Sequence, residues 1–222
     1  MSCCDTATQQ PAWSSMDEII PVAGVLPLTT VDYPDRLALV VFTQGCPWRC
    51  GYCHNAGLRS TGRPTAWRWR QVCDLLDERR GFLEAVVFSG GEPTLHRGLE
   101  DALRTVRQKG FLAGLHTAGM FPERLPRLLP WLDWIGLDIK APFDERYGQL
   151  TGDGRSMTKV LLSLVLLQSW GLPFQLRTTV GPGALNEQDF DELRRQIRQL
   201  EAPEPVRQDV RPLHADNPHT IP

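Results

Sequence analysis

The chain is poor in lysine and lacks any long apolar run. Of its 24 basic residues only Lys109, Lys140 and Lys159 are lysines, and the formal net charge is -2. A net charge this small gives no broad field that would steer nucleic acid or an anionic membrane to the protein. No apolar segment approaches the roughly 20 residues of a membrane-spanning helix, and the polar start MSCCDTATQQ does not resemble a signal peptide. We therefore expect a cytoplasmic protein that binds neither nucleic acid nor membrane.

The sequence has six cysteines, whose role depends on the redox compartment and on their spacing. In a reducing compartment they are better explained as metal ligands, reactive thiols or small core residues. Cys3 and Cys4 lie in the polar start, for which we expect no function. Cys73 lies in the helical pattern QVCDLLD, where we expect a small buried side chain. The other three cysteines lie close together and carry the argument below.

A length of 222 residues with 41% hydrophobic content suits one folded domain. We expect this domain over residues 21–211. The stretch 1–20 is polar and aperiodic, and the stretch 212–222 continues a segment rich in proline and charge. Both are predicted to be poorly ordered tails.

Short apolar runs alternate with longer segments of helical spacing. The runs predict buried strands at 37–42, 84–89, 111–117, 134–140 and 174–179, with a weaker sixth at 205–211. The helical segments are 65–80, 99–110, 122–132, 159–171 and 187–201. This alternation predicts parallel strands joined by right-handed crossovers. Because six units are too few for a complete eight-stranded barrel, we expect an α/β fold of the partial, open (β/α)6 barrel type, with its active site at the carboxyl ends of the strands.

Three cysteines follow the first predicted strand within the segment TQGCPWRCGYCHN. Cys46, Cys50 and Cys53 are separated by three and then two residues, so one loop delivers three thiolates. Three thiolates on a cluster of four irons leave one iron open for chemistry. Zinc is the alternative, since sulfur ligands also suit it and His54 follows as a fourth ligand. The third alternative is that the three cysteines are unrelated core residues. A loop that contains glycine and proline is a poor place for such buried thiols.

A second motif, SGGEPTLH, ends the second predicted strand. It places Ser89, Gly90, Gly91 and Glu92 at the carboxyl end of that strand. Two glycines allow backbone to approach a ligand closely, and the carboxylate of Glu92 suits an ammonium group. An ordinary tight turn after a strand is the alternative.

Polar side chains also end the later strands. Thr117 lies in LHTAG, Asp138 and Lys140 lie on one face of LDIK, and Arg177 precedes TTVGPG. Taken alone, an Asp-x-Lys sequence is usually a simple ion pair. The spacing alone therefore does not assign a function to these residues.

The cysteine spacing, the aromatic Tyr52, the following His-Asn and the GGEP turn one strand later together resemble the radical S-adenosylmethionine (SAM) superfamily. The resemblance implies that Cys46, Cys50 and Cys53 ligate a 4Fe-4S cluster whose open iron binds the amino and carboxylate groups of SAM. It also implies a set of residues near SAM: Tyr52, His54, Ser89, Gly90, Gly91, Glu92, Thr117, Asp138, Lys140 and Arg177. The sequence departs from the family at His116-Thr117-Ala118-Gly119, where relatives often have Asp-Thr-Asn-Gly.

The resemblance extends from residue 24 to about residue 183 and is strongest to the glycyl-radical activating branch. The TTVDYP segment, the CHN ending and the small size are similar to the activating proteins of anaerobic ribonucleoside-triphosphate reductase, and pyruvate formate-lyase activating enzyme is a near relative. The implied activity is reductive cleavage of SAM, which produces a glycyl radical on a partner enzyme, with electrons from a reduced flavodoxin- or ferredoxin-like donor. Two alternatives remain: action on a small molecule, as in 7-carboxy-7-deazaguanine synthase, and a zinc-dependent binding module. An open barrel favours a protein substrate, because it admits a loop of another chain.

Overall fold

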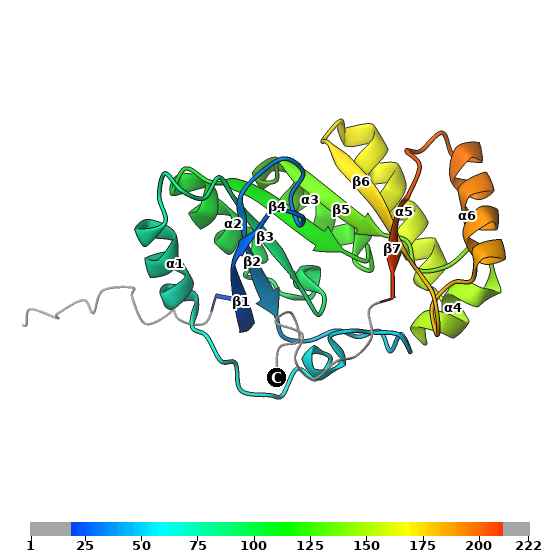
Figure 1. Cartoon of the computed structure of the whole chain (residues 1–222), viewed down its shortest axis with the longest axis horizontal. Helices are drawn as coiled ribbons and strands as arrows, with labels where there is room; N and C mark the ends of the chain where they lie inside the picture. The colour runs from blue at the N-terminus through cyan, green and yellow to red at the C-terminus, as the bar shows by residue number, and fades with distance from the viewer. Residues whose placement is uncertain (1–18, 211–222) are drawn as a thin grey trace, which may run out of the picture.

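The computed structural model describes residues 19–210, which form one sheet of seven strands in chain order (Figure 1). The strands are β1 (Val22–Thr29), β2 (Ala38–Thr43), β3 (Ala85–Gly90), β4 (Leu112–Thr117), β5 (Trp134–Asp138), β6 (Phe174–Val180) and β7 (Val206–Asp209). Strands β2 to β7 are parallel, and β1 pairs antiparallel with β2. The sheet keeps two edges, β1 and β7. The predicted open α/β fold with six parallel strands is confirmed.

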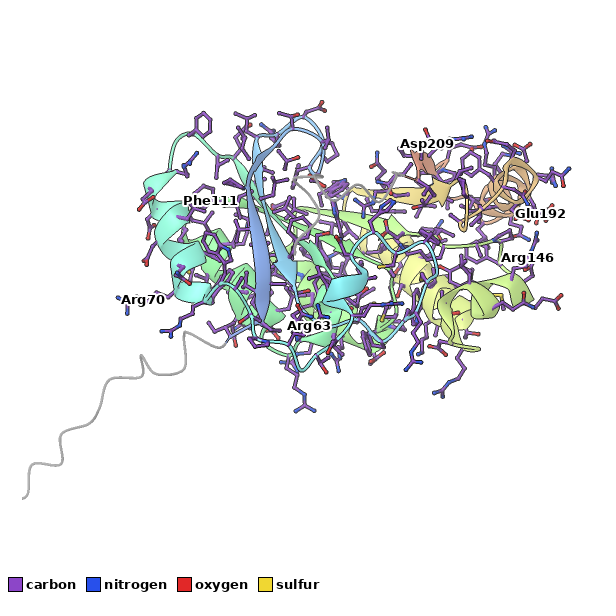
Figure 2. All side chains as sticks on the ribbon, turned by 60° about the horizontal axis from the view of Figure 1, so that its bottom comes forward. Arg63, Arg70, Phe111, Arg146, Glu192 and Asp209 are labelled. Atoms are coloured by element: carbon purple, nitrogen blue, oxygen red, sulfur yellow. The ribbon has the colours of Figure 1, made fainter. Side chains whose placement is uncertain are left out.

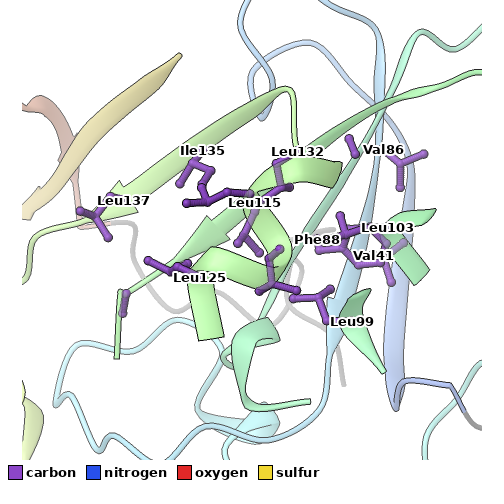
Figure 3. Packing of buried hydrophobic residues seen from close by; sticks show 14 of the residues in the cluster. Val41, Val86, Phe88, Leu99, Leu103, Leu115, Leu125, Leu132, Ile135 and Leu137 are labelled. Carbon is purple, nitrogen blue, oxygen red and sulfur yellow. The ribbon is translucent and has the colours of Figure 1, made fainter. Parts of the chain in front are cut away.

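Helices follow the parallel strands and cover the outer face of the sheet. They are α1 (Trp69–Glu78), α2 (Leu99–Gln108), α3 (Leu125–Leu128), α4 (Glu145–Thr151), α5 (Ser156–Trp170) and α6 (Glu187–Gln199). In α2, Leu99, Leu103 and Val106 are buried, the spacing of one helical face. They pack on Val86 and Phe88 of the sheet (Figure 3). Cys73 is buried in α1, as expected.

Three local features differ from the sequence prediction. Strand β1 was not predicted, and its Pro27 is tolerated because this is an edge strand with an irregular register. The single helix predicted over 122–132 is three short pieces: η4 (Pro122–Arg124), α3 and η5 (Leu129–Trp131). Pro126 and Pro130 lack the N–H that a continuous helix needs there. Helix α4 was not predicted either, and it ends at Gly152 in the left-handed conformation.

A second, smaller apolar cluster lies on the other face of the sheet. The loop between β1 and β2 carries Tyr33, whose ring lies 5.3 Å from that of Trp134 on β5. Both pack with Val40 and Val87 from β2 and β3. This cluster takes up the interior beside Trp134, the first residue of β5, whereas the polar residues described below lie at the carboxyl ends of the strands.

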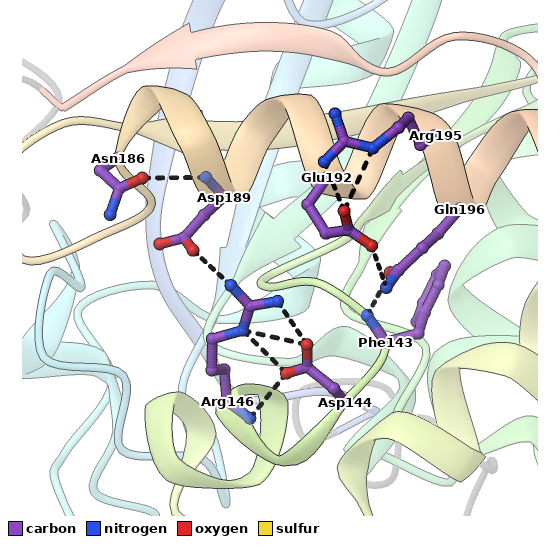
Figure 4. A network of polar contacts seen from close by, with 8 residues as sticks. All are labelled: Phe143, Asp144, Arg146, Asn186, Asp189, Glu192, Arg195 and Gln196. Carbon is purple, nitrogen blue, oxygen red and sulfur yellow. Dashed lines mark hydrogen bonds and ion pairs between the residues drawn. The ribbon is translucent and has the colours of Figure 1, made fainter.

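A polar network fixes α4 against α6 (Figure 4). Arg146 bonds to Asp144, the N-cap of α4, and to Asp189 in the first turn of α6 at 2.5 Å. The backbone N–H of Phe143 donates to Gln196 Oε1 at 2.7 Å. Helix α4 therefore has a defined position, which matters for the site because α4 contacts the cysteine loop.

The tails predicted at 1–20 and 212–222 lie almost entirely outside the described residues. Ile19 and Ile20 are described, and Ile20 is buried. The expected domain limits, 21–211, stay a prediction. No helix within residues 19–210 is long and apolar enough to cross a bilayer.

Candidate active site

The three cysteines lie on the loop that follows β2, at the carboxyl end of the sheet. Cys46, Cys50 and Cys53 are partly buried, and all three are free thiols. The N–H of Cys46 donates to the carbonyl of Arg59 at 3.1 Å, which folds the loop back on itself. The three sulfurs are thus held on one short segment with a fixed base.

Helix α4 supports this loop from outside. The N–H of Arg49 donates to the carbonyl of Thr151 at 2.9 Å, and the indole N–H of Trp48 donates to Asp153 at 3.3 Å. Trp48 is 3% exposed. The network between α4 and α6 thereby holds the loop that carries the cysteines.

The thiols of Cys46 and Cys50 are in an environment that disfavours thiolate without a bound cation. Burial raises the pKa of Cys46 to about 12, and the carboxylate of Glu92 adds to this effect. Burial also raises the pKa of Cys50, against the opposing effect of the Lys140 ammonium. A metal centre supplies the positive charge that such thiols need, because it deprotonates a coordinating thiol outright. Three soft sulfur donors therefore fit an iron-sulfur cluster.

The zinc alternative finds no support in the geometry. Within residues 19–210 no group of three or more His, Cys, Asp or Glu side chains is placed to hold a metal ion. His54 follows Cys53 in the same loop and is partly buried. In a 4Fe-4S cluster the cysteine thiolates bind different irons, so they do not need to converge on one ion.

The GGE turn packs directly on the base of the cysteine loop. The N–H of Glu92 donates to the carbonyl of Gly45 at 2.8 Å, and the N–H of Gly91 donates to the carbonyl of Thr43 at 2.9 Å. A Cβ on Gly91 would lie 2.2 Å from the Gly45 carbonyl oxygen, and one on Gly90, whose φ is +109°, would lie 2.5 Å from Thr43 N. Both glycines are required by this backbone packing. The structure thus gives these glycines a role in protein packing, while their predicted role beside SAM stays a prediction.

Glu92 lies inside the protein at 1% exposure and joins β3 to β4. Its carboxylate accepts hydrogen bonds from Thr94, from Thr117 Oγ1 at 2.6 Å and from the N–H of Ala118 at 2.9 Å. Burial raises the pKa of Glu92, while the donors of Thr117 and Thr94 act to lower it. Glu92 and Thr117, predicted separately, are therefore bonded to each other.

Asp138, Lys140 and Arg177 form a charged triad at the end of β5. Arg177 Nε donates to Asp138 Oδ1 at 2.8 Å, and Lys140 Nζ donates to Asp138 Oδ2 at 3.0 Å. Burial alone would raise the pKa of Asp138, but Arg177 and Lys140 outweigh it and hold that pKa well below its usual range. Conversely, Asp138 keeps the pKa of Lys140 above its usual value despite burial. The triad thus stays fully ionised and carries one excess positive charge.

Tyr52 connects the cysteine loop to the triad. The Lys140 ammonium lies 5.9 Å from the centre of the Tyr52 ring. Burial raises the pKa of Tyr52 to about 12, against the opposing effect of Lys140. The aromatic residue between Cys50 and Cys53 therefore lies near Lys140, just beyond the end of β5.

Hydrogen bonds link Asp32, His116 and Ser89 in the barrel interior, and the donor and acceptor of each bond can be assigned. His116 Nε2 lies 2.8 Å from the carbonyl oxygen of Asp32, and its Nδ1 lies 3.3 Å from Ser89 Oγ. The carbonyl can only accept, so Nε2 carries the proton and Nδ1 accepts from the Ser89 hydroxyl. Burial, together with Arg177, keeps the pKa of His116 well below its usual value, so the ring is neutral. The remaining lone pairs of Ser89 Oγ are then left for a donor.

Two residues of this region were not among the predicted site residues. His116 was noted only as a departure from the family pattern. Tyr147 of α4 is fully buried, and its hydroxyl accepts a hydrogen bond from the N–H of Lys140 at 3.0 Å. Tyr147 follows no recognisable motif, so no sequence signal pointed to it.

Comparisons with known proteins agree with this geometry. The family model described as "Radical SAM superfamily" matches residues 40–197. A Methanocaldococcus jannaschii protein named as a glycyl-radical enzyme activating enzyme is 29% identical over 185 residues, covering 80% of this chain and 75% of the relative. The pyruvate formate-lyase-activating enzyme of Listeria monocytogenes is 30% identical over 209 residues, covering 87% of this chain and 81% of the relative.

Among solved structures, anSMEcpe with bound S-adenosylmethionine and a peptide has a TM-score of 0.62. The match has 17% sequence identity and covers 82% of this chain and 55% of that chain, so it shows the fold. The chain thus spans about half the length of this solved relative. The cofactors that this family uses are a 4Fe-4S cluster and SAM. With its cysteine loop, its GGE turn and these relatives, the chain belongs to the radical SAM superfamily and is an enzyme of the glycyl-radical enzyme activating class.

Proposed function

We propose that this enzyme cleaves SAM reductively at a cluster held by Cys46, Cys50 and Cys53 and generates a glycyl radical on a partner enzyme. The observation that carries the proposal is the contact of the cysteine loop with two polar groups at once. Backbone bonds join it to the GGE turn, and Tyr52 joins it to the ionised triad. When bound, the cluster supplies one electron, which splits SAM into methionine and a 5'-deoxyadenosyl radical that takes a hydrogen atom from a glycine Cα.

The residues of the chain would hold and orient SAM beside the cysteines. The excess positive charge of the triad suits the methionyl carboxylate, and the lone pairs of Ser89 Oγ suit a donor of the ligand. The proposed SAM contacts are Tyr52, His54, Ser89, Gly90, Gly91, Glu92, Thr117, Asp138, Lys140 and Arg177. Within this set, Glu92 and Thr117 would act mainly by fixing the turn, since most of the carboxylate's acceptor capacity is used internally. The apolar cluster around Tyr33 and Trp134 would keep water from the amino-terminal side of the barrel.

The partner that we propose is anaerobic ribonucleoside-triphosphate reductase, on the basis of the TTVDYP segment and the CHN ending. A pyruvate formate-lyase-like enzyme is the second candidate, because several relatives are named as pyruvate formate-lyase-activating enzymes. The electron would come from a reduced flavodoxin- or ferredoxin-like protein. We place the reaction in the cytoplasm, since free thiols that assemble a cluster require a reducing compartment.

The test is anoxic reconstitution with iron and sulfide, followed by incubation with SAM, a reductant and each candidate partner. We expect 5'-deoxyadenosine in the mixture and a glycyl radical signal by electron paramagnetic resonance on the reductase. A radical on pyruvate formate-lyase alone would select the second candidate. Good SAM cleavage without a radical on either protein would contradict the activase function and favour a small-molecule substrate.

The matched controls are Cys50→Ala and Cys73→Ala. Cys50 is a proposed ligand, whereas Cys73 is buried in α1 away from the loop. We expect Cys50→Ala to lose the cluster absorbance and all 5'-deoxyadenosine. Cys73→Ala should retain both, because it removes a small core side chain only.

A further inference from the structure

One buried side chain contacts both halves of the candidate site. Tyr147 of α4 is fully buried. Its hydroxyl accepts a hydrogen bond from the backbone N–H of Lys140 at 3.0 Å, and its ring lies 6.2 Å from the Trp48 ring in an edge-to-face arrangement. Trp48 stands between Cys46 and Cys50 in the sequence, whereas Lys140 belongs to the charged triad. Tyr147 therefore links the loop of the predicted cluster ligands to the triad.

The hydroxyl of Tyr147 takes the place of a strand partner for Lys140. Strand β5 ends at Asp138, and the N–H of Ile139 still donates to the carbonyl of Arg177 on β6 at 2.8 Å. Strand β4 is no longer paired with β5 at this level. Among the described residues, the acceptor for the N–H of Lys140 is the Tyr147 hydroxyl instead of a strand carbonyl. This bond fixes the backbone from which the Lys140 side chain extends to Asp138.

The hydroxyl of Tyr147 keeps its proton in the physiological pH range. Burial raises the pKa of Tyr147 above its usual value, against the opposing effects of the N–H and the ammonium group of Lys140. A neutral hydroxyl accepts a hydrogen bond without adding a negative charge beside the triad. A tyrosinate at this place would cancel the one excess positive charge that the triad carries.

Tyr147 itself is held by several contacts of α4. The Phe143 ring stacks on the Tyr147 ring at 6.2 Å, with an interplanar angle of 5°. Thr151 Oγ1 donates to the carbonyl of Tyr147 at 2.9 Å, and the carbonyl of Thr151 accepts the N–H of Arg49 at 2.9 Å. Arg146, the residue before Tyr147, lies beside α6 (Figure 2). A side chain fixed in this way can act as a rigid spacer between two parts of a site.

Resting on the proposed function, we infer that Tyr147 is a positioning residue, which sets the place of Lys140 and Asp138 relative to the cysteine loop. SAM would have to reach the cluster and the triad at once, so the separation of these two parts decides how well it binds. The ring supports the loop through Trp48, and the hydroxyl holds the backbone of Lys140. An ordinary core tyrosine is the alternative, and there phenylalanine would serve equally well.

Two variants separate the tasks of the hydroxyl and the ring. Tyr147→Phe removes the hydroxyl and keeps the ring, whereas Tyr147→Leu removes both. The matched control is Thr105→Val on α2, which also deletes one hydroxyl bonded to the backbone, at 2.8 Å from the carbonyl of Asp101. Each full-length protein is reconstituted without oxygen and its iron per chain is measured. SAM binding is then measured by titration, through the change in the electron paramagnetic resonance spectrum of the reduced cluster.

Hydrogen exchange measures the proposed bond directly. The chain has only three lysines, so the N–H of Lys140 can be compared with those of Lys109 and Lys159. The N–H of Lys109 bonds to the carbonyl of Thr105 at 3.0 Å, and that of Lys159 bonds to the carbonyl of Arg155 at 3.2 Å. In the reconstituted Tyr147→Phe protein we expect the N–H of Lys140 to exchange about tenfold faster than in the parent, by residue-resolved mass spectrometry. The other two lysines should exchange as in the parent.

We expect Tyr147→Phe to bind SAM about tenfold more weakly than the parent. Its iron per chain and its rate of 5'-deoxyadenosine formation at saturating SAM should match the parent. Tyr147→Leu should also bind less iron per folded chain, and Thr105→Val should match the parent in every measurement. Parent-like SAM binding by Tyr147→Phe would overturn the inference. An equal loss of iron in both Tyr147 variants would also overturn it, because the residue would then only support the fold.

Failure of the proposed function would give a different result. A parent protein that takes up iron yet forms no 5'-deoxyadenosine with SAM and a reductant would refute the proposed chemistry. Hydrogen exchange at Lys140 requires neither SAM nor a partner enzyme, so it would still decide whether Tyr147 holds the backbone of the triad.

Discussion

Gly91→Ala tests the claim that the GGE turn positions the cysteine loop through its backbone. The new Cβ would lie 2.2 Å from the carbonyl oxygen of Gly45 and 2.7 Å from its carbonyl carbon. Non-bonded heavy atoms settle near 3.5 Å, so the two segments must separate by about 1 Å. Because both partners are backbone, no rotamer change can relieve the contact. We expect a loss of roughly 3 kcal/mol in the free energy of unfolding, at the upper end for overpacking.

The displacement should reach the cluster, because Gly45 directly precedes Cys46. The bond from the N–H of Glu92 to the carbonyl of Gly45 would also lengthen from 2.8 Å. We therefore expect Gly91→Ala to bind less iron after anoxic reconstitution, even at temperatures where the variant is folded. Iron per chain and the urea midpoint of unfolding measure the two effects separately.

Two glycine variants serve as controls. Gly62→Ala lies between the cysteines and α1, and its Cβ would meet nothing within 4 Å, so both measurements should match the parent. Gly98→Ala would place a Cβ 1.9 Å from the carbonyl of Ile19, far in sequence from the cysteines, and should lower stability with less effect on iron per folded chain. Parent-like iron content in a destabilised Gly91→Ala would refute the positional argument.

Two further variants test the charged interior. Asp138→Asn leaves Arg177 and Lys140 without their carboxylate, at a cost of about 3 kcal/mol near pH 7 measured by urea unfolding. The folded pKa of Asp138 is lowered, so this difference should persist above about pH 4 and shrink as the pH falls further; a difference that is independent of pH would contradict the ion pairs. The lowered pKa of His116 means that the unfolded state takes up the proton first, so stability should fall as the pH drops below about 6.5. His116→Gln should lessen that slope by up to about 1.4 kcal/mol per pH unit, and an identical slope would show that His116 titrates normally.

Much of the fold could be predicted because parallel strands leave a strong signal. Runs such as LALVVF are apolar at every position, and β2 is buried on both faces. Strand β1 escaped detection because Gly24 and Pro27 interrupt its apolar pattern, a composition that only an edge position tolerates. The prediction of one continuous helix over 122–132 was wrong because the helical spacing of its apolar residues was given more weight than Pro126 and Pro130, which interrupt a helix.

The residues of the candidate site could be predicted from the sequence, but the hydrogen bonds between them could not. The motifs placed Glu92 and Thr117 near one ligand, yet nothing in the sequence indicated that their side chains bond each other. Long-range pairs such as Asp32 with His116 depend on where the β1–β2 loop enters the barrel. That entry is fixed by the packing of Tyr33 on Trp134, a tertiary contact without a local signature.

The histidine at position 116 fits the charge balance of the interior. Asp138 is already neutralised by two cations, Lys140 and Arg177, and the surplus is one positive charge. A carboxylate at position 116 would cancel that surplus. A histidine held neutral by its bond to the Asp32 carbonyl leaves it in place. A buried charge without a partner is costly, so the interior favours an anionic ligand group beside the triad, and under the proposed function the methionyl carboxylate of SAM would supply one.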